Sequence, residues 1–357
     1  MRILNHKELS HKKILVIDES AKNANDRTWC FWEDRSGYFE DLVYKKWDSL
    51  FFKTENCKLQ LQIAPYLYKM IRGIDFYDYC FTKINATDQV TFLQGKVNVS
   101  ELHSNGSISI GEHKVDTQDA IIFNSIYQPT DLNKGHHLLQ HFTGWVIETA
   151  EPAFREATLM DFSTSQEHGT AFFYVLPFSS TSALVEYTLF TKNILEKEAY
   201  DRELKRYISK KIGIAEYKIC ETEFGIIPMS SNKPPFVKND IYQIGVAGGM
   251  AKGSTGYAFK FIQEHSDLII SRLLQSDLPE RFVPKPRFLF YDMILLHILS
   301  NRTLTGEEIF QRLFEKNMAN AVFKFLDNKT TPAEELKIIS KLPTLPFLKA
   351  AIKEILN

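Results

Sequence analysis

The stretch KKILVIDE, residues 12–19, constrains the fold more than any other part of this chain. Its aliphatic and β-branched residues predict a short strand, and two acids, Asp18 and Glu19, close it. The second strand of a dinucleotide-binding βαβ unit ends in this way, with a carboxylate placed to bind the ribose hydroxyls. Such a unit also requires a first strand and a G-x-G-x-x-G turn about 20 residues earlier. The preceding residues, MRILNHKELSH, contain no glycine.

The composition excludes several classes of protein. The chain has 357 residues, 44% of them hydrophobic and 24% charged, which is ordinary for a globular protein of one or two domains. A formal net charge of −1 gives no basic field for nucleic acid. The 4 cysteines show neither a C-x-x-C pair nor zinc spacing, so we expect reduced thiols and a cytoplasmic location. No signal peptide is recognisable, and no run approaches the roughly 18 apolar residues of a membrane span.

Apolar periodicity predicts the order of the elements. A helix is predicted over residues 60–81 and a β-meander over residues 90–124. Period-2 alternation predicts an antiparallel sheet over residues 140–191, followed by a helix over residues 196–212. The segment DIYQIGVAGGMAKGSTGYAFKFIQEHSDLII, residues 240–270, predicts a strand, a glycine-rich turn and a helix. The remainder of the chain predicts helices only.

These elements predict an α/β nucleotide-binding domain with an inserted antiparallel-sheet domain and a helical C-terminal region. The expected boundaries are 1–135 with 218–278 for the first domain, 136–217 for the second and 279–357 for the helical region. The most apolar window, FLFYDMILLHIL at residues 288–299, fits a core helix. The sequence favours this interpretation and leaves open a helix that lies on a membrane surface.

The glycine-rich stretch GVAGGMAKGSTGYAF, residues 245–259, is one candidate binding site. A strand that runs through glycines into a helix gathers free backbone N–H groups at the positive end of the helix, where a phosphate can bind. The alternative is a tight turn that needs glycine only for its backbone angles.

Two acids in the predicted sheet are candidate catalytic residues. Glu186, in SALVEYTLF, shares a strand face with Leu184 and Thr188 by period 2. A carboxyl on an apolar face has a raised pKa, which suits a general acid. Asp161, in TLMDF, is a second acid in a neighbouring predicted strand, and two carboxyls in one apolar site would separate in pKa. The alternative is a glutamate exposed to solvent at a strand edge.

The histidine-rich stretch HHLLQH is a weak candidate for metal binding. His137 and His141 stand at the i, i+4 spacing of a helical metal pair. Because no further acid or histidine completes the pattern, we expect no metal site.

Several longer motifs occur in an order that resembles one known family. They are NDRTWCFWE at 25–33, GW at 144–145, LMDF at 159–162, FFYVLPF at 172–178, ALVEYT at 183–188, GIIPM at 225–229 and AGGMAKGSTGYAF at 247–259. In this order the chain is similar to the bacterial-type lycopene cyclases, which are flavin-dependent carotenoid cyclases with a two-domain flavoprotein fold. The resemblance extends from about residue 12 through the helical C-terminal region.

The resemblance implies a specific chemistry. These enzymes close the linear ψ ends of lycopene into β-ionone rings, through γ-carotene to β-carotene. The net reaction is an isomerisation that nevertheless needs reduced FAD, with NADPH as the usual reductant. An acid protonates the terminal double bond, the next double bond attacks the carbocation, and loss of a ring proton completes the product. Because lycopene resides in bilayers, a peripheral contact with the inner face of the cell membrane is also expected, through the apolar window at 288–299.

The resemblance also assigns roles to residues. Glu186 falls on the motif that supplies the acid, although Tyr187 stands where some relatives carry a second acid. Asp161 falls on the aspartate of the family's Met-Asp segment, as a partner that tunes or reprotonates Glu186. Asp18 or Glu19 would bind the adenosine ribose. The remaining flavin contacts implied by the resemblance are Arg27, Gly248, Gly249, Ser254, Thr255 and Gly256.

One departure from the family concerns the beginning of the chain. Relatives begin with an apolar strand, a G-x-G-x-x-G turn and a helix before the strand that matches KKILVIDE, and here residues 1–5 fall in the end of that helix. We expect a longer natural chain that carries the glycine turn. The alternatives are a related FAD-dependent hydroxylase or isoprenoid reductase, or an inactive remnant that binds no FAD.

Overall fold

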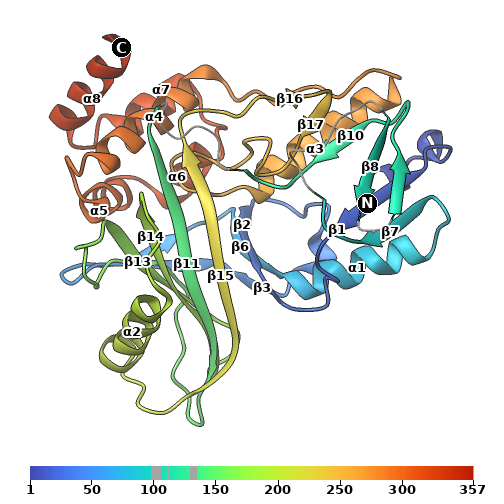
Figure 1. Cartoon of the computed structure of the whole chain (residues 1–357). Coiled ribbons are helices and arrows are strands. Elements are labelled where there is room, and N and C mark those ends of the chain that lie inside the picture. Colours follow the sequence, from blue (N-terminus) through green and yellow to red (C-terminus); the bar gives the residue numbers. More distant parts are fainter. Residues whose placement is uncertain (98–105, 111–112, 129–134, 357) are drawn as a thin grey trace.

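The computed structural model describes residues 1–97, 106–110, 113–128 and 135–356, and the statements below concern these residues (Figure 1). Its largest element is a 7-stranded sheet with the strand order β15-β11-β14-β13-β12-β4-β5. All neighbouring strands are antiparallel except β12 and β4. The strands are β4 (Ser49–Lys53), β5 (Lys58–Gln62), β11 (His137–Glu148), β12 (Thr158–Asp161), β13 (Thr170–Pro177), β14 (Ser182–Thr191) and β15 (Lys218–Ser230).

The two faces of this sheet are covered by different parts of the chain. Helix α2 (Lys197–Tyr207) packs on one face, where its Tyr200 and Leu204 contact side chains such as Val185 and Phe173. The other face, with Leu184 and Phe172, belongs to the main core that the C-terminal helices complete. Figure 1 shows α2 beside the lower part of the long strands and the C-terminal helices above it. The alternation of side chains along β13 and β14 therefore sorts them between two separate cores.

A second, smaller sheet packs against the main core. It has the order β2-β6-β3 with antiparallel pairing throughout. Its strands are β2 (Thr28–Glu33), β6 (Leu67–Arg72) and β3 (Lys45–Trp47). Trp32 from β2 and Tyr68 from β6 are buried in the main core. This smaller sheet therefore faces the large sheet across the main core.

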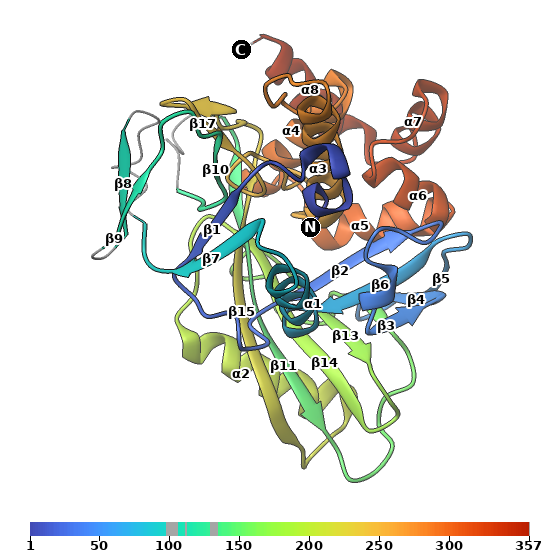
Figure 2. The ribbon, with the colours of Figure 1, turned by 90° about the vertical axis from the view of Figure 1, so that its right-hand side faces the viewer.

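The parallel part of the molecule is built from short strands. β1 (Ile14–Asp18) pairs in parallel with β7 (Val90–Gln94), and β10 (Ile122–Asn124) pairs in parallel with β17 (Ile241–Gln243). Strand β16 (Val237–Lys238) adds to β17 in antiparallel fashion. Figure 2 shows β1 and β7 with helix α1 below them. The remaining elements of this part are α1 (Gly73–Asn85), the hairpin β8 (Ser107–Ile110) and β9 (His113–Asp116), and α3 (Phe259–Leu274).

The C-terminal region is helical, as the sequence predicts. Its helices are α4 (Pro286–Ser300), α5 (Gly306–Lys316), α6 (Ala319–Leu326), α7 (Pro332–Ile339) and α8 (Thr344–Leu356). Helix α4 contributes Ile294, Leu296 and Ile298 to the main core, so the apolar window is a core helix and not a surface helix. No helix among the described residues is both long and apolar enough to span a membrane.

The structure corrects two predicted elements. The helix expected over residues 60–81 is half wrong, because β5, a turn at Pro65 and β6 precede α1. The expected meander is limited to the hairpin β8–β9, since β7 and β10 pair in parallel with strands distant in the sequence. Residues 98–105 of that meander lie outside the described residues. The predicted strands within residues 140–191, the helix over 196–212 and the strand, turn and helix over 240–270 are confirmed.

The large sheet does not follow the expected domain boundaries. β4 and β5 come from residues 49–62 and β15 from residues 218–230, all of which the sequence assigned to the nucleotide-binding domain. Pairing between strands that are far apart in the chain is not encoded in local periodicity, so the sequence pattern could not place them.

Candidate active site

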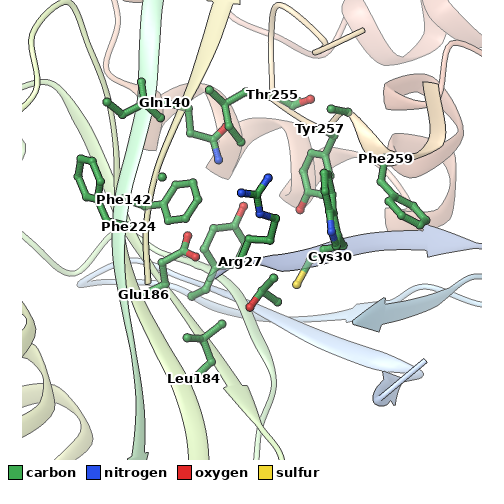
Figure 3. Close-up of a pocket in the computed structure, with 18 of the residues that line it drawn as sticks. Arg27, Cys30, Gln140, Phe142, Leu184, Glu186, Phe224, Thr255, Tyr257 and Phe259 are labelled. Atoms are coloured by element: carbon green, nitrogen blue, oxygen red, sulfur yellow. The ribbon is translucent and has the colours of Figure 1, made fainter. Parts of the chain in front are cut away.

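A cavity of about 400 Å³ separates the large sheet from the smaller one (Figure 3). Strands β11, β13, β14 and β15 form one wall. The opposite wall comes from β2, from β6 and from the turn that precedes α3. The lining is mostly apolar and aromatic, with Phe142, Tyr174, Phe224, Tyr257 and Phe259 among its side chains. A cavity of this composition suits an apolar ligand with a few polar contacts.

Glu186 on β14 points into this cavity (Figure 3). Its side chain is buried, with 9% of the residue exposed, so the solvent-exposed alternative is wrong. The predicted face is confirmed, because Leu184 also lines the cavity and Thr188 Oγ1 donates a hydrogen bond of 2.6 Å to Glu186 Oε1. Glu186 is therefore a buried carboxyl at an apolar wall, and the Thr188 hydroxyl is one of its hydrogen-bond partners.

A second glutamate, Glu223, faces Glu186 across a glycine. Strand β11 lies between β14 and β15, and its Gly144 pairs with Glu186 on one side and with Glu223 on the other. Directly paired residues of antiparallel strands project from the same side of a sheet, so both glutamates project on the side of the cavity. Their backbones are two strand spacings apart, about 9–10 Å. Because Gly144 has no side chain, the two carboxyls can approach each other over it.

The two carboxyls shift each other's pKa. Burial, and then the neighbouring charge of Glu223, raise the pKa of Glu186 well above its usual value. Burial also raises the pKa of Glu223, whereas a 2.8 Å hydrogen bond from Thr28 Oγ1 opposes that shift. Among the described residues, Oε1 of Glu223 is buried without a hydrogen-bond donor, and the Glu186 side chain also contacts the Glu223 carboxyl. We infer that Glu186 holds the proton of the pair and Glu223 is the ionised member.

The geometry at Gly144 gives a direct test of this pair. A Cβ at position 144 would lie 2.9 Å from Glu223 Cγ and 3.0 Å from Leu184 Cδ1, so Gly144→Ala must displace the Glu223 side chain. We expect the rate of the reaction catalysed at this site to fall on the order of 10-fold to 100-fold, because misplacing a catalytic group by about 1 Å has effects of this size. Turnover and thermal melting should be measured together. Normal turnover in a folded Gly144→Ala protein would contradict a role for the contact between the carboxyls.

The raised pKa of Glu186 also predicts how stability depends on pH. Between the usual glutamate value of 4.5 and the raised value in the fold, the native state binds more protons than the unfolded state. The free energy of unfolding therefore falls as the pH rises through this window. Glu186→Gln cannot ionise, so we expect its melting temperature to exceed that of the unmodified protein by a margin that grows with pH, reaching about 2–4 °C. Thermal melts between pH 5 and 8 measure the margin, and a constant margin would disprove the linkage.

Both walls of the cavity carry neutral hydroxyls, and β2 adds a thiol. Tyr68 and Tyr257 share a hydrogen bond of 3.0 Å between their hydroxyls. Burial raises the pKa values of Tyr68, Tyr174 and the Cys30 thiol well above their usual ranges. These groups remain protonated at physiological pH, so the two glutamates are the acid–base groups of this part of the cavity.

Asp161 does not join this pair, which corrects the expected partnership with Glu186. It lies on β12, where Tyr207 Oη of α2 donates a 2.6 Å hydrogen bond to Asp161 Oδ2, on the α2 side of the sheet. The backbone N–H of Ser163 donates to Asp161 Oδ1 at 2.9 Å. Asp161 does not line the cavity. Its side chain holds α2 to the sheet, and the partner of Glu186 is Glu223 instead.

The glycine-rich turn is brought to the cavity only in part. Thr255 and Gly256 line the cavity, and Ser254 is buried next to them. Gly248 and Gly249 lie elsewhere in the turn, where a Cβ on Gly248 would be 2.4 Å from the carbonyl oxygen of Gln243. The structure therefore supports the tight-turn interpretation for Gly248 and Gly249. Thr255 and Gly256, in contrast, form part of the cavity wall.

Comparison with protein-family models gives one match, to the family described as lycopene cyclase protein, over residues 5–352. The chain belongs to the lycopene cyclase family. This assignment confirms the resemblance seen in the sequence motifs. No curated protein matches the sequence of this family member significantly.

Solved structures resemble this lycopene cyclase family member in fold. A geranylgeranyl bacteriochlorophyll reductase-like protein from Thermoplasma acidophilum has a TM-score of 0.59 and 12% identity, with coverage of 96% of this chain and 98% of that chain. The halogenase PltM has a TM-score of 0.58 and 10% identity, covering 96% of this chain and 90% of that one. The flavin-dependent brominase Bmp2 has a TM-score of 0.54 and 14% identity, covering 98% and 94%. The predicted fold class, an α/β flavoprotein fold with C-terminal helices, is confirmed.

The cavity walls of this lycopene cyclase family member fit a flat polar ring such as the isoalloxazine of FAD. Three buried polar atoms at the wall, Trp29 Nε1, Gln140 Oε1 and Thr255 Oγ1, have no partner among the described residues. A Cβ on Gly256 would lie 2.0 Å from Gln140 Oε1, so the backbone closely approaches the wall there. Helix α3 begins at Phe259, beside the cavity, and presents its positive end to it. Donors, acceptors and a helix dipole thus converge on one space.

Of the other predicted flavin contacts, Arg27 lines the cavity, whereas Asp18 and Glu19 do not. Arg27 extends into the cavity (Figure 3), while its guanidinium also forms a 2.7 Å ion pair with Asp26. Asp18 ends β1 and pairs with Lys22 at 2.9 Å, and Glu19 is exposed. Neither acid lines the cavity. Both stand at the carboxyl end of a parallel strand, where nucleotides bind in α/β folds, and their ribose contact stays a prediction.

The sequence reasoning missed Glu223, Gly144 and Gln140. Glu223 lies in KICETEFGIIPM, where exposed Glu221 and Lys218 make the strand resemble a solvent-facing edge. The usable signal was the change from charged to apolar residues within β15, since Glu223 shares a face with Gly225 and Ile227. Nothing in the sequence shows that this face pairs with Gly144.

Proposed function

We propose that the chain is a lycopene β-cyclase that closes the ψ ends of lycopene into β-ionone rings in carotenoid biosynthesis. The observation that carries the proposal is Glu186 at the wall of an aromatic cavity, in contact with a second buried carboxyl, Glu223, in a member of the lycopene cyclase family. A hydrocarbon substrate offers no polar handle, so an apolar cavity with one buried acid is the chemistry that it requires.

The pair supplies both proton transfers of this isomerisation. Protonated Glu186 gives its proton to the terminal double bond, and the next double bond attacks the resulting carbocation to close the ring. At that moment both carboxyls are ionised, so two negative charges lie beside the cation and stabilise it. The Glu223 carboxylate then takes the ring proton and returns it to Glu186 through their direct contact. No atom is gained or lost overall.

Aromatic side chains assist by excluding water. Phe142, Tyr174 and Tyr257 present apolar surfaces and π-faces to the cavity, and a carbocation over such faces is attracted to them. Water excluded from the cavity cannot capture the cation as an alcohol.

A flavin would complete the polar side of the cavity. Gln140, Thr255, Gly256 and the first turn of α3 would hold its ring system, and Arg27 would lie beside it. Reduced FAD, with NADPH as the reductant, would supply an electron-rich surface next to the cation. The flavin-dependent brominase among the structural neighbours supports this cofactor.

Product analysis tests the proposal. The chain should be expressed in bacterial cells that accumulate lycopene, and the carotenoids separated and weighed by mass spectrometry. We expect β-carotene or γ-carotene, whose mass equals that of lycopene. A product with two added hydrogens would support an isoprenoid reductase, a function that the reductase-like structural neighbour suggests, and one added oxygen would support a hydroxylase. Either product would overturn the cyclase proposal, as would unchanged lycopene with a purified chain that carries flavin.

A membrane contact, which the substrate requires, is proposed at α8 instead of α4. Five of its apolar side chains are exposed along one side, with Lys349 and Lys353 nearby: Leu345, Leu348, Ile352, Ile355 and Leu356. An apolar stripe flanked by lysines is typical of helices that lie in the interface of anionic bilayers.

Vesicle binding checks this surface. We expect the double change of Leu348 and Ile352 to Ser to lower co-sedimentation with phosphatidylglycerol vesicles by on the order of 10-fold or more, since each buried apolar side chain contributes about 1.5–3 kcal/mol. Leu336→Ser on α7, which is 69% exposed, is the matched control and should bind normally. Equal loss in both proteins would exclude a specific contact through α8.

A further inference from the structure

We propose that His136, His297 and Glu354 form a binding site for a divalent transition-metal ion such as Zn²⁺. The three residues come from distant parts of the chain: His136 directly precedes β11, His297 is in the last turn of α4, and Glu354 is in the last turn of α8. In the portion of the chain that the structure describes, this is the one group of such side chains whose ligand atoms all lie within 4.8 Å of one another.

The distances between the ligand atoms match a tetrahedral ion. His136 Nε2 and His297 Nδ1 are 3.2 Å apart. Metal–ligand bonds of about 2.0–2.1 Å at tetrahedral angles place neighbouring ligand atoms about 3.3–3.4 Å apart. Glu354 Oε1 lies 2.7 Å from His136 Nε2 and also contacts His297 Nδ1. A small outward rotation of the flexible glutamate would open the space for an ion between the three atoms.

The donor set is also that of known metal sites. Two imidazoles and one carboxylate form a three-ligand zinc site that leaves a fourth position for water. The His297 and Glu354 side chains are each 9% exposed, so both are largely shielded from water. The His136 side chain is 24% exposed, which leaves a route from solvent to the ion.

The cluster lies apart from the candidate active site. None of its three residues lines the cavity that contains Glu186. Its position joins α8 to α4 and to the start of β11, and α4 also packs directly against each of these two elements. A bound ion would therefore fix α8, whose opposite side carries the exposed apolar residues. The alternative is a cluster held by hydrogen bonds alone, with the Glu354 carboxylate accepting from both rings.

Metal titration of the full chain separates these interpretations. The purified protein should be freed of metal with a chelator, dialysed, and titrated with Zn²⁺ in competition with a chromophoric chelator. We expect one ion per chain with a Kd on the order of 1 μM or below. Co²⁺ should give the visible absorption of a tetrahedral centre. Absence of stoichiometric binding in the unmodified protein would overturn the proposal.

Variants assign the ion to these residues. His297→Gln and Glu354→Gln should each weaken binding by at least 10-fold and abolish the Co²⁺ absorption, with circular dichroism melts showing that they fold. If either fails to fold, His136→Gln replaces it, because His136 is the most exposed ligand. His137→Gln is the matched control, since His137 is the next residue in the chain but not part of the cluster, and it should bind normally. Undiminished binding in the ligand variants would overturn the proposal.

Discussion

Glu186→Gln is expected to lower the rate of lycopene cyclisation by about 10²- to 10⁴-fold, the usual contribution of a general acid. Gln has the shape of a protonated glutamate, so it can still accept the 2.6 Å hydrogen bond from Thr188 Oγ1 and donate toward Glu223. An amide, however, has no acidic proton to give to a double bond. The packing of the wall is retained while the chemistry is removed.

The measurement is the initial rate of ring formation with lycopene in vesicles and reduced flavin, supported by flavin content and thermal melting of the same samples. Glu221→Gln is the matched control: it lies on the same strand as Glu223, is exposed, and should react at nearly the normal rate. If Glu186→Gln forms rings as fast as Glu221→Gln does, Glu186 is not the acid and the proposed proton transfers are wrong.

The long strands were predictable because the apolar residues within each segment already indicate which of its faces are buried. β13 and β14 are apolar on both faces, and the structure shows why: one face packs against α2 and the other against the C-terminal helices. A strand buried on both sides produces a continuous apolar run with occasional polar residues, and Glu186 stood out as one of these. The same property that revealed the strand therefore revealed the candidate acid.

Residues 60–81 show where local periodicity fails. Leu61, Tyr68 and Ile71 fit a helical spacing, but they are buried on β5 and β6. Short apolar runs fit strand and helix alike, and Pro65 between them was the signal against one continuous helix. Local periodicity also failed to predict that β4, β5 and β15 belong to the large sheet. The pairing partners of a strand are determined by the tertiary structure and not by the segment itself.

The candidate site was half predictable for the same physical reason. Glu186 is conspicuous because its neighbours along the chain are apolar, whereas Glu223 lies in a strand whose first half is exposed and charged. Asp161 looked equivalent to Glu186 in sequence, but a strand has two faces and it projects toward Tyr207. Which acids meet depends on the register around Gly144, and register is visible only once the strands are paired.

Glu223→Gln is expected to move the alkaline limit of the cyclisation reaction to lower pH. The reaction requires protonated Glu186, so activity is lost as the pH rises through the pKa of that group. Burial and the negative charge of Glu223 both raise this pKa. Replacing Glu223 by a neutral amide removes the second effect and leaves the first, so the pKa of Glu186 falls and activity disappears at a lower pH. The maximal rate should also fall, by on the order of 10-fold to 100-fold, because the group that takes the ring proton is lost.

The displaced alkaline limit and the lower maximal rate report two different roles of Glu223. Measuring kcat/KM from pH 5 to 9 determines both. A lower maximal rate with an unmoved alkaline limit would mean that Glu223 takes the ring proton without influencing Glu186. A displaced limit with a normal maximal rate would mean that Glu223 sets the pKa of Glu186, while the Glu186 carboxylate itself takes the proton back. Both effects should be much smaller in Glu221→Gln, because the charge of Glu221, which also raises the pKa of Glu223, is exposed and screened by solvent. If Glu223→Gln matches that control in both respects, the carboxyl pair that Gly144 brings together is not the catalytic unit.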